Sequence, residues 1–173
     1  MQKIIQLKCS KNIGSVEVKK SSIHNKGLFA RDDMQKGAFI IEYSGDKISK
    51  EEGSRRESES LNQNGTTYIF ELDDICDIDG SSEINIAKYA NHSCKPNCKI
   101  SIRQQVVNGN KIKHIWLQSL SDIKKGEEIT YNYGFSSEEK LWKCNCSSSG
   151  CVGFMVARDE WKKLKSRLKR SSI

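Results

Sequence analysis

The sequence has no long hydrophobic run, and proline occurs only once, at Pro96, in its 173 residues. A membrane-spanning helix needs about 20 apolar residues. The first ten residues offer only Ile4, Ile5 and Leu7 as a short apolar stretch, whereas a secretory signal needs an apolar core of about 7–15 residues. Internal repeats and low-complexity tracts are also missing. We therefore expect a soluble, intracellular protein.

The apolar residues that are present, 36% of the chain, are enough for the core of one compact domain. They gather in short, β-prone runs bounded by Gly, Asn and Ser, a pattern that predicts strands. These runs cover residues 38–43, 66–72, 100–107 and 112–120. Because they do not alternate with helical segments, the sequence predicts a mainly β fold (α+β) with few short helices.

Two segments have helical signals instead. Ser49 is a candidate N-cap because Glu52 follows three residues later, which predicts an exposed helix or a mobile insertion over residues 49–61. Near the end of the chain, Trp161, Leu164 and Leu168 recur at helical spacing among lysines. This second pattern predicts an amphipathic terminal helix.

The net charge of +7 is concentrated in this terminal segment, where six Lys or Arg side chains lie within residues 162–170. A basic field of this kind attracts acidic partners such as nucleic acid or nucleoprotein. The same charges are equally compatible with a solvated helix face or a frayed tail.

Seven cysteines could form disulfides, but the number is odd and three of them have the spacing Cys-x-Cys-x4-Cys. We favour a metal knuckle in a reducing compartment. Structural zinc takes four ligands, so Cys144, Cys146 and Cys151 need a fourth, and Cys94 is our candidate. Alternatively, Cys94 is a buried thiol and the knuckle is an independent zinc or redox unit. The spacing of Cys9, Cys76 and Cys98 suggests no such role.

Two further patterns are compatible with a binding site. Residues 22–30 predict a tight turn that leads into an apolar strand, where Gly27 would let the backbone approach a ligand. His24 in this turn could also be an ordinary surface histidine. Tyr131 and Tyr133 are separated by one residue, so both side chains point to the same side of a strand.

Together these segments resemble the SET-domain protein lysine methyltransferases with a cysteine-rich post-SET segment. The similarity covers about residues 14–154, in the family order. The turn at residues 24–27 resembles the family's Gly-x-Gly motif, although Asn25 replaces the first glycine; Asn tolerates a positive φ better than most residues. The other matching segments are 42–46 (EYSGD), 68–70 (YIF), 85–94 (NIAKYANHSC) and 130–133 (TYNY).

The resemblance implies small curved sheets in which the segment of Tyr131 and Tyr133 threads the Asn91 loop, a pseudoknot. It implies a post-SET zinc cap, S-adenosylmethionine as methyl donor, and Tyr133 as the catalytic tyrosine. We expect an N-terminal extension at residues 1–13, a SET domain at 14–136, the zinc knuckle at 140–156 and a basic helix or tail at 157–173. The cofactor-binding residues implied by the family pattern are His24, Lys26, Gly27, Leu28, Tyr68, Asn91, His92 and Asn145.

Tyr43, Tyr68, Tyr131 and Tyr133 would line a narrow channel for the substrate lysine, although Tyr43 and Tyr68 could instead serve strand packing. The implied activity is methylation of a lysine, most often on a histone tail, in the nucleus of a eukaryote. A tyrosine at position 131 implies a mono- or dimethyl product. The alternatives are a methyltransferase of a non-histone protein, a SET-fold module that binds a lysine-rich tail or nucleic acid without catalysis, and a plain zinc-knuckle nucleic-acid binder.

Overall fold

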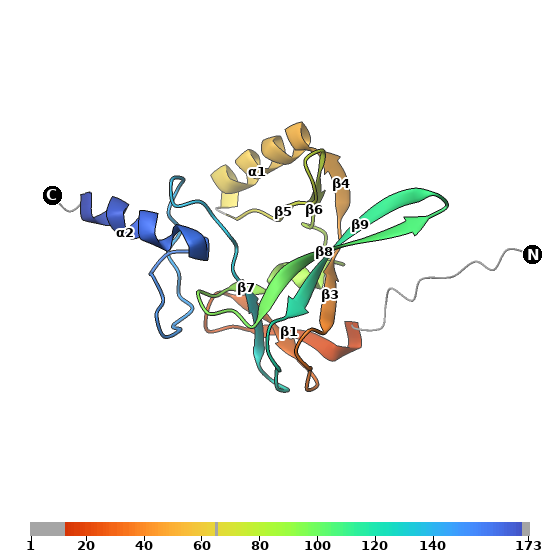
Figure 1. Ribbon diagram of the computed structural model, residues 1–173, viewed down its shortest axis with the longest axis horizontal. Helices are drawn as coiled ribbons and strands as arrows, with labels where there is room; N and C mark the ends of the chain where they lie inside the picture. The colour runs from red at the N-terminus through yellow and green to blue at the C-terminus, as the bar shows by residue number, and fades with distance from the viewer. Residues whose placement is uncertain (1–12, 65, 171–173) are drawn as a thin grey trace, which may run out of the picture.

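The short β-prone runs fold into three small sheets (Figure 1). The computed structural model describes residues 13–64 and 66–170. The predicted N-terminal extension and Cys9 therefore lie outside the described residues, apart from Ile13. The first sheet has the strand order β1-β2-β10-β7 and consists of β1 (Val16–Lys20), β2 (Lys26–Ala30), β10 (Glu128–Tyr131) and β7 (Asn91–His92).

The second and third sheets hold the remaining strands. The second has the order β3-β9-β8, with β3 (Phe39–Tyr43), β9 (Asn110–Ser119) and β8 (Cys98–Val107). The third has the order β4-β6-β5, with β4 (Asp46–Ser49), β6 (Cys76–Asp79) and β5 (Ile69–Glu71). Three short 3-10 turns, η1 (Ile13–Ser15), η2 (Ile86–Tyr89) and η3 (Arg158–Glu160), complete the described elements together with two α-helices. The predicted mainly β fold is confirmed.

The core lies where the first two sheets meet, and it fixes the strands that carry the site. Leu28 on β2 is opposite Ile129 on β10, and both side chains are 0% exposed. Ile115 and Leu117 on β9 are each 1% exposed. Because Leu28 and Ile129 alternate with Gly27 and Glu128 along their strands, burial of the apolar pair places Gly27 and Glu128 on the opposite face of the sheet, where Glu128 contacts Ser21.

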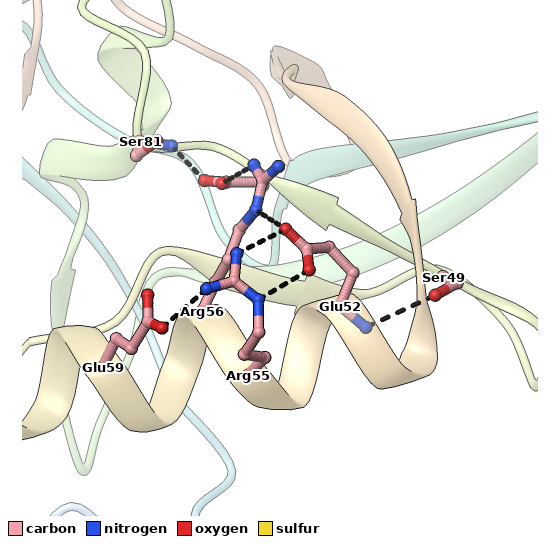
Figure 2. A network of polar contacts seen from close by, with 7 residues as sticks. Ser49, Glu52, Arg55, Arg56, Glu59 and Ser81 are labelled. Atoms are coloured by element: carbon pink, nitrogen blue, oxygen red, sulfur yellow. Dashed lines mark hydrogen bonds and ion pairs between the residues drawn. The ribbon is translucent and has the colours of Figure 1, made fainter.

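Helix α1 (Lys50–Asn64) confirms the predicted helix, and ion pairs hold it against the third sheet (Figure 2). The Ser49 hydroxyl accepts the backbone N–H of Glu52 at 3.3 Å, as an N-cap does. The Glu52 carboxylate binds Arg56 at 2.7 Å, and Arg56 reaches Asp79 on β6 at 2.6 Å. Leu61 is the only large apolar residue of α1, so polar contacts replace an apolar helix face here.

Helix α2 (Trp161–Arg170) confirms the predicted terminal helix. Leu164 is 0% exposed, and the indole N–H of Trp161 donates to the carbonyl of Val156 at 3.3 Å. The helix lies at the opposite end of the molecule from the tip of the β8–β9 hairpin (Figure 1). Among the described helices, none combines the length and the apolar character that a membrane span requires.

Candidate active site and metal centre

Asn91 joins the β1–β2 turn to strand β10. Its Nδ2 atom donates to the carbonyl of Lys26 at 2.9 Å and to the carboxylate of Glu128 at 2.7 Å, and it lies 3.4 Å from the carbonyl of His24. Because these partners are all acceptors, they fix which end of the carboxamide carries the N–H groups. The Oδ1 atom of Asn91 makes no hydrogen bond to any residue that the structure describes. The buried side chain thus presents an oriented acceptor beside the turn.

Glu128 completes this polar junction. Its two carboxylate oxygens accept the hydroxyl of Ser21 at 2.8 and 2.9 Å, in addition to the amide of Asn91. A side-chain methyl group at Gly27 would overlap the Glu128 carboxylate. Glycine at this position is therefore needed for the close approach of β2 to the carboxylate.

The turn itself adopts the backbone conformation that its sequence predicts. Asn25 has a φ of 42°, so it takes the left-handed conformation in place of glycine. His24 and Lys26 are exposed, whereas Gly27 and Leu28 are buried in β2. The Lys26 ammonium lies 5.1 Å from the ring centroid of Tyr89. Four of the predicted cofactor-binding residues thus follow one another along this turn and strand, next to Asn91.

His92 links the tyrosine segment to the cysteine cluster. Its side chain is 1% exposed, and its Nδ1 atom accepts the backbone N–H of Tyr133 at 3.1 Å. The proton of the neutral ring is therefore on Nε2, which lies 3.7 Å from the sulfur of Cys94. Burial lowers the pKa of His92 to about 4, so the imidazole is uncharged near neutral pH.

A series of aromatic rings lies beside strand β7, which carries Asn91 and His92. Ring centroids are 5.1 Å apart for Tyr43 and Phe70, 6.1 Å for Phe70 and Tyr131, and 4.9 Å for Tyr131 and Tyr133. Phe135 extends the series, 5.7 Å from Tyr133. Strand β10 ends at Tyr131, so Tyr133 lies past the strand rather than on it, but its ring still packs beside that of Tyr131. We call this pair the tyrosine wall.

The tyrosine hydroxyls differ in how they are held. Tyr133 donates to the carbonyl of Ala90 at 3.1 Å, and Tyr43 donates to the carbonyl of Tyr68 at 2.8 Å. The hydroxyl of Tyr131 makes no hydrogen bond within the described part of the chain. Burial, and then the neighbouring phenols, hold the pKa of Tyr43, Tyr131 and Tyr133 well above the usual range. All three are neutral phenols at physiological pH.

The two remaining predicted cofactor-binding residues lie in different places. Tyr68 precedes β5, and the ammonium of Lys88 lies 5.4 Å from its ring centroid. Asn145 is exposed between two cysteines of the cap. In residues 13–64 and 66–170, no hydrogen bond joins Asn145 to the turn or to Asn91.

Four cysteine sulfurs come together at the end of the chain. The thiols of Cys94, Cys144, Cys146 and Cys151 all lie within 4.8 Å of one another. The Cys94 sulfur is 3.8 Å from that of Cys144 and 3.6 Å from that of Cys151. Four thiolates around zinc at about 2.3 Å would be about 3.8 Å apart. The donor set and its spacing therefore fit a tetrahedral zinc ion, and the structure joins Cys94 to the other three as its sequence position suggested.

Backbone N–H groups point at these sulfurs. The N–H of Cys94 donates to Cys146 at 3.4 Å, that of Cys146 to Cys144 at 3.5 Å, and that of Gly153 to Cys151 at 3.4 Å. Burial opposes ionisation of Cys146, but hydrogen bonds from Ser148 and from the backbone lower the pKa of its thiol to about 6. At Cys146 these donors favour thiolate, the form that binds metal. Burial raises the pKa of Cys94 to about 11 and that of Cys144 well above its usual range.

Sequence reasoning missed the residues that support the site through long-range contacts. The carboxamide of Asn97 accepts the backbone N–H of Thr130 at 2.9 Å and donates to the carbonyl of Glu128 at 2.9 Å. Ser21 and Glu128 are 107 residues apart. The acid at position 128 is visible in the sequence just before Thr130, but no local pattern indicates its partner.

Comparison with known proteins gives a consistent result. The SET domain family matches residues 25–134. The histone-lysine N-methyltransferase, H3 lysine-4 specific, of Aspergillus oryzae is 38% identical over 144 residues, which are 81% of this chain and 11% of that protein. The histone-lysine N-methyltransferase trithorax of Drosophila virilis is 36% identical over 140 residues (81% and 4%), and human histone-lysine N-methyltransferase 2B is 36% identical over 143 residues (82% and 5%).

The chain thus spans about a tenth or less of the length of these relatives. Within this span, the family match begins in the turn next to Asn91 and includes the tyrosine segment and Cys94. The other three cysteines of the cluster lie beyond its end, at positions 144, 146 and 151. The sequence match and the arrangement of the site agree, and the chain belongs to the SET domain family.

Proposed function

We propose that this protein is a lysine methyltransferase that transfers a methyl group from S-adenosylmethionine to the side-chain amine of a histone lysine. The single observation that carries the proposal is the neutral tyrosine wall, Tyr131 and Tyr133, packed beside the Asn91–His92 strand. Family membership and the names of the relatives support it. On this proposal residues 14–136 form the catalytic unit, residues 140–156 the cap, and the site of action is the nucleus.

The turn and its neighbours fit the amino-acid part of the cofactor. The free Oδ1 acceptor of Asn91 suits an ammonium group, and the exposed Lys26 offers a cation for a carboxylate. S-adenosylmethionine supplies an electrophilic methyl group on a positively charged sulfur. The residues that would hold it are His24, Lys26, Gly27, Leu28, Tyr68, Asn91, His92 and Asn145.

The tyrosine wall would favour the uncharged amine that the reaction needs. A lysine with its ordinary pKa of about 10.4 costs about 4.6 kcal/mol to deprotonate at pH 7. Neutral phenols of Tyr43, Tyr131 and Tyr133 bring no negative charge that would stabilise ammonium, and burial disfavours the charged form. The lysine ammonium would lose its proton to solvent before the amine is enclosed, so no separate base is required. The residues act by excluding water and by alignment, which contributes about 7–11 kcal/mol in well-oriented reactions.

Tyr131 would limit the number of methyl groups. Its hydroxyl has no partner among the described residues, and its ring lies 4.9 Å from that of Tyr133, so this hydroxyl would occupy the space of an additional methyl. We infer a mono- or dimethyl product. Mass spectrometry of a methylated histone-tail peptide tests this: Tyr131→Phe should shift the product toward trimethyllysine, and a wild-type enzyme that already trimethylates would contradict it.

The four clustered cysteines would hold one structural zinc ion. Zinc would balance half of the negative charge of four thiolates and pin residues 140–156 to the loop that carries Cys94. Because Cys94 is two residues from His92, the ion would also support the strand beside the tyrosine wall.

The decisive experiment measures transfer of a labelled methyl group to isolated histones, nucleosomes and free tail peptides. Tyr133→Phe removes the hydroxyl that is held by Ala90, and we expect turnover to fall by about two orders of magnitude or more, in the range of effects for a positioned catalytic group. The matched control is Tyr89→Phe, whose hydroxyl bonds Glu83 at 3.2 Å and no other residue in the described ranges. Wild-type protein that binds S-adenosylmethionine but labels none of the substrates would refute the proposal.

A further inference from the structure

Helix α2 presents a dense positive face whose orientation is fixed. Six of its ten residues are Lys or Arg and none is acidic. All six are exposed, because the helix buries Leu164 instead and Trp161 bonds the carbonyl of Val156. The charges are therefore displayed on a docked helix rather than on a frayed tail.

This face borders a hollow of about 630 Å³ between α2 and the segment at residues 137–138. All of its lining side chains are polar or charged: Ser137, Glu138, Lys162, Lys163, Ser166, Arg167 and Arg170. A groove that binds a protein partner presents apolar pockets for anchor residues. Four cations and two hydroxyl groups outnumber the single carboxylate of Glu138 in this lining, and cations with hydroxyl groups are the side chains that bind phosphates.

Internal contacts use part of this charge to hold the hollow in place. Arg167 donates to the backbone carbonyls of Ser137 and Glu139, and Lys163 pairs with Glu160 at 3.1 Å. Neither Lys162 nor Arg170 forms an ion pair with any residue in the described ranges. These contacts hold Arg167 and Lys163 in place, whereas Lys162 and Arg170 at the rim of the hollow are available to a ligand.

We propose that this face of α2 binds the phosphate backbone of duplex DNA. The helix is about 15 Å long, and duplex DNA carries one charge per about 1.7 Å, so several phosphates lie within reach of its cations. Single strands are bound by stacking on open aromatic rings, but Lys140 lies 4.0 Å over the ring of Trp142 and Arg158 lies 5.5 Å from that of Trp161. The choice of duplex DNA as the ligand rests on the proposed function, because a histone tail in a nucleosome lies next to DNA.

Salt dependence gives the expected size of the effect. Two of the four cations that line the hollow, Lys162 and Arg170, are not engaged in ion pairs within the described part of the chain, which predicts a slope of about −1.8 for the logarithm of the association constant against that of salt, or an affinity loss of about 12-fold between about 50 and 200 mM. The double variant Lys162→Gln with Arg170→Gln removes two contacts. Its slope should be close to zero, so that its affinity changes by less than about twofold over the same range.

The test is fluorescence anisotropy of the full chain with a labelled 30-bp duplex over a series of salt concentrations. The matched control, Lys36→Gln with Lys111→Gln, removes the same net charge at two exposed sites away from α2 and should keep the wild-type slope. Equal slopes for both double variants, or salt-insensitive binding, would overturn the proposal. Tighter binding of single-stranded DNA or of polyglutamate would overturn it as well, because the surface would then serve a different polymer.

Methyl-transfer assays separate this inference from the proposed function. The Lys162→Gln, Arg170→Gln variant should methylate a free histone-tail peptide as the wild type does, but nucleosomes about tenfold less efficiently at about 150 mM salt. Equal loss on both substrates would contradict docking to DNA. If the wild type methylates neither substrate while duplex binding follows the predicted slopes, the proposed function fails and the docking surface stands.

Discussion

Removal of the Glu128 carboxylate should weaken the junction between the β1–β2 turn and strand β10. Two donors bind this carboxylate, the Ser21 hydroxyl at 2.8 Å and the Asn91 amide at 2.7 Å. A hydrogen bond to a charged group contributes about 1.5–3 kcal/mol. Because Glu128 is only half-buried, water replaces part of this interaction. We expect Glu128→Ala to lower the free energy of unfolding by about 2–4 kcal/mol.

Gly27→Ala should act through the same carboxylate. The added methyl would overlap the Glu128 carboxylate, which must then move away from Ser21 and Asn91. Gly27 does not have a positive φ, and alanine in a strand gains about 0.5–1 kcal/mol over glycine. The net cost in the wild type should be about 1–3 kcal/mol. In the Glu128→Ala background the carboxylate is gone and only the ring of Phe29, 3.0 Å from the added methyl, remains close, so the second substitution should cost less than about 1 kcal/mol.

Urea unfolding of the four proteins measures this coupling, provided that the slopes with denaturant are unchanged. We expect a coupling free energy of about 1–3 kcal/mol, in the sense that the double variant is more stable than the sum of the single changes predicts. Gly14→Ala is the control, because a methyl there meets no atom within 4 Å. Additive costs for Gly27→Ala and Glu128→Ala would refute the reasoning.

Three further results are expected. Cys94→Ser should reduce bound zinc from about one ion per chain to a small fraction by elemental analysis, whereas Cys98→Ser, outside the cluster, should retain it. Leu164→Ala, at a side chain that is 0% exposed, should lower the free energy of unfolding by about 2–5 kcal/mol in urea titrations. Burial opposes ionisation of Asp79, but the ion pair with Arg56 lowers the pKa of the Asp79 carboxyl below the usual value. The stability that this ion pair contributes is therefore present above about pH 4, and it is lost as the pH falls through the folded-state pKa of Asp79. Arg56→Gln should therefore reduce the loss of stability between about pH 5 and pH 2, and an unchanged acid profile would argue against this ion pair.

Local signals in the sequence predicted the elements whose determinants are local. Ser49 and Glu52 lie three residues apart and mark the beginning of α1, and Leu164 marks the buried face of α2. Asn25 adopts the predicted positive φ because this preference belongs to a single residue. The tyrosine wall was predicted in part, since the spacing of Tyr131 and Tyr133 gives their common direction but not the end of β10.

The contacts that were not predicted join residues far apart in the chain. Ser21 and Glu128 are separated by 107 residues, and Arg56 and Asp79 by 23. No periodicity records which acid faces which donor, because such pairs form only after the sheets have assembled. The attachment of α1 through ion pairs, with Leu61 as its only large apolar residue, also lies outside what a hydrophobic pattern can indicate. The threading of the Asn91 loop stays a prediction of the resemblance.

The eight residues from position 91 to position 98 connect every part of the candidate site. Asn91 holds the turn, His92 accepts the backbone N–H of Tyr133, Cys94 joins the cap, and Asn97 binds strand β10. A segment with four attachments in eight residues has little freedom to move at one point without moving at the others. Loss of the cap should therefore disturb the position of Tyr133 even though no cap residue belongs to the tyrosine wall. The proposed zinc ion would act on methyl transfer through this segment, as a support of geometry rather than as a participant in the chemistry.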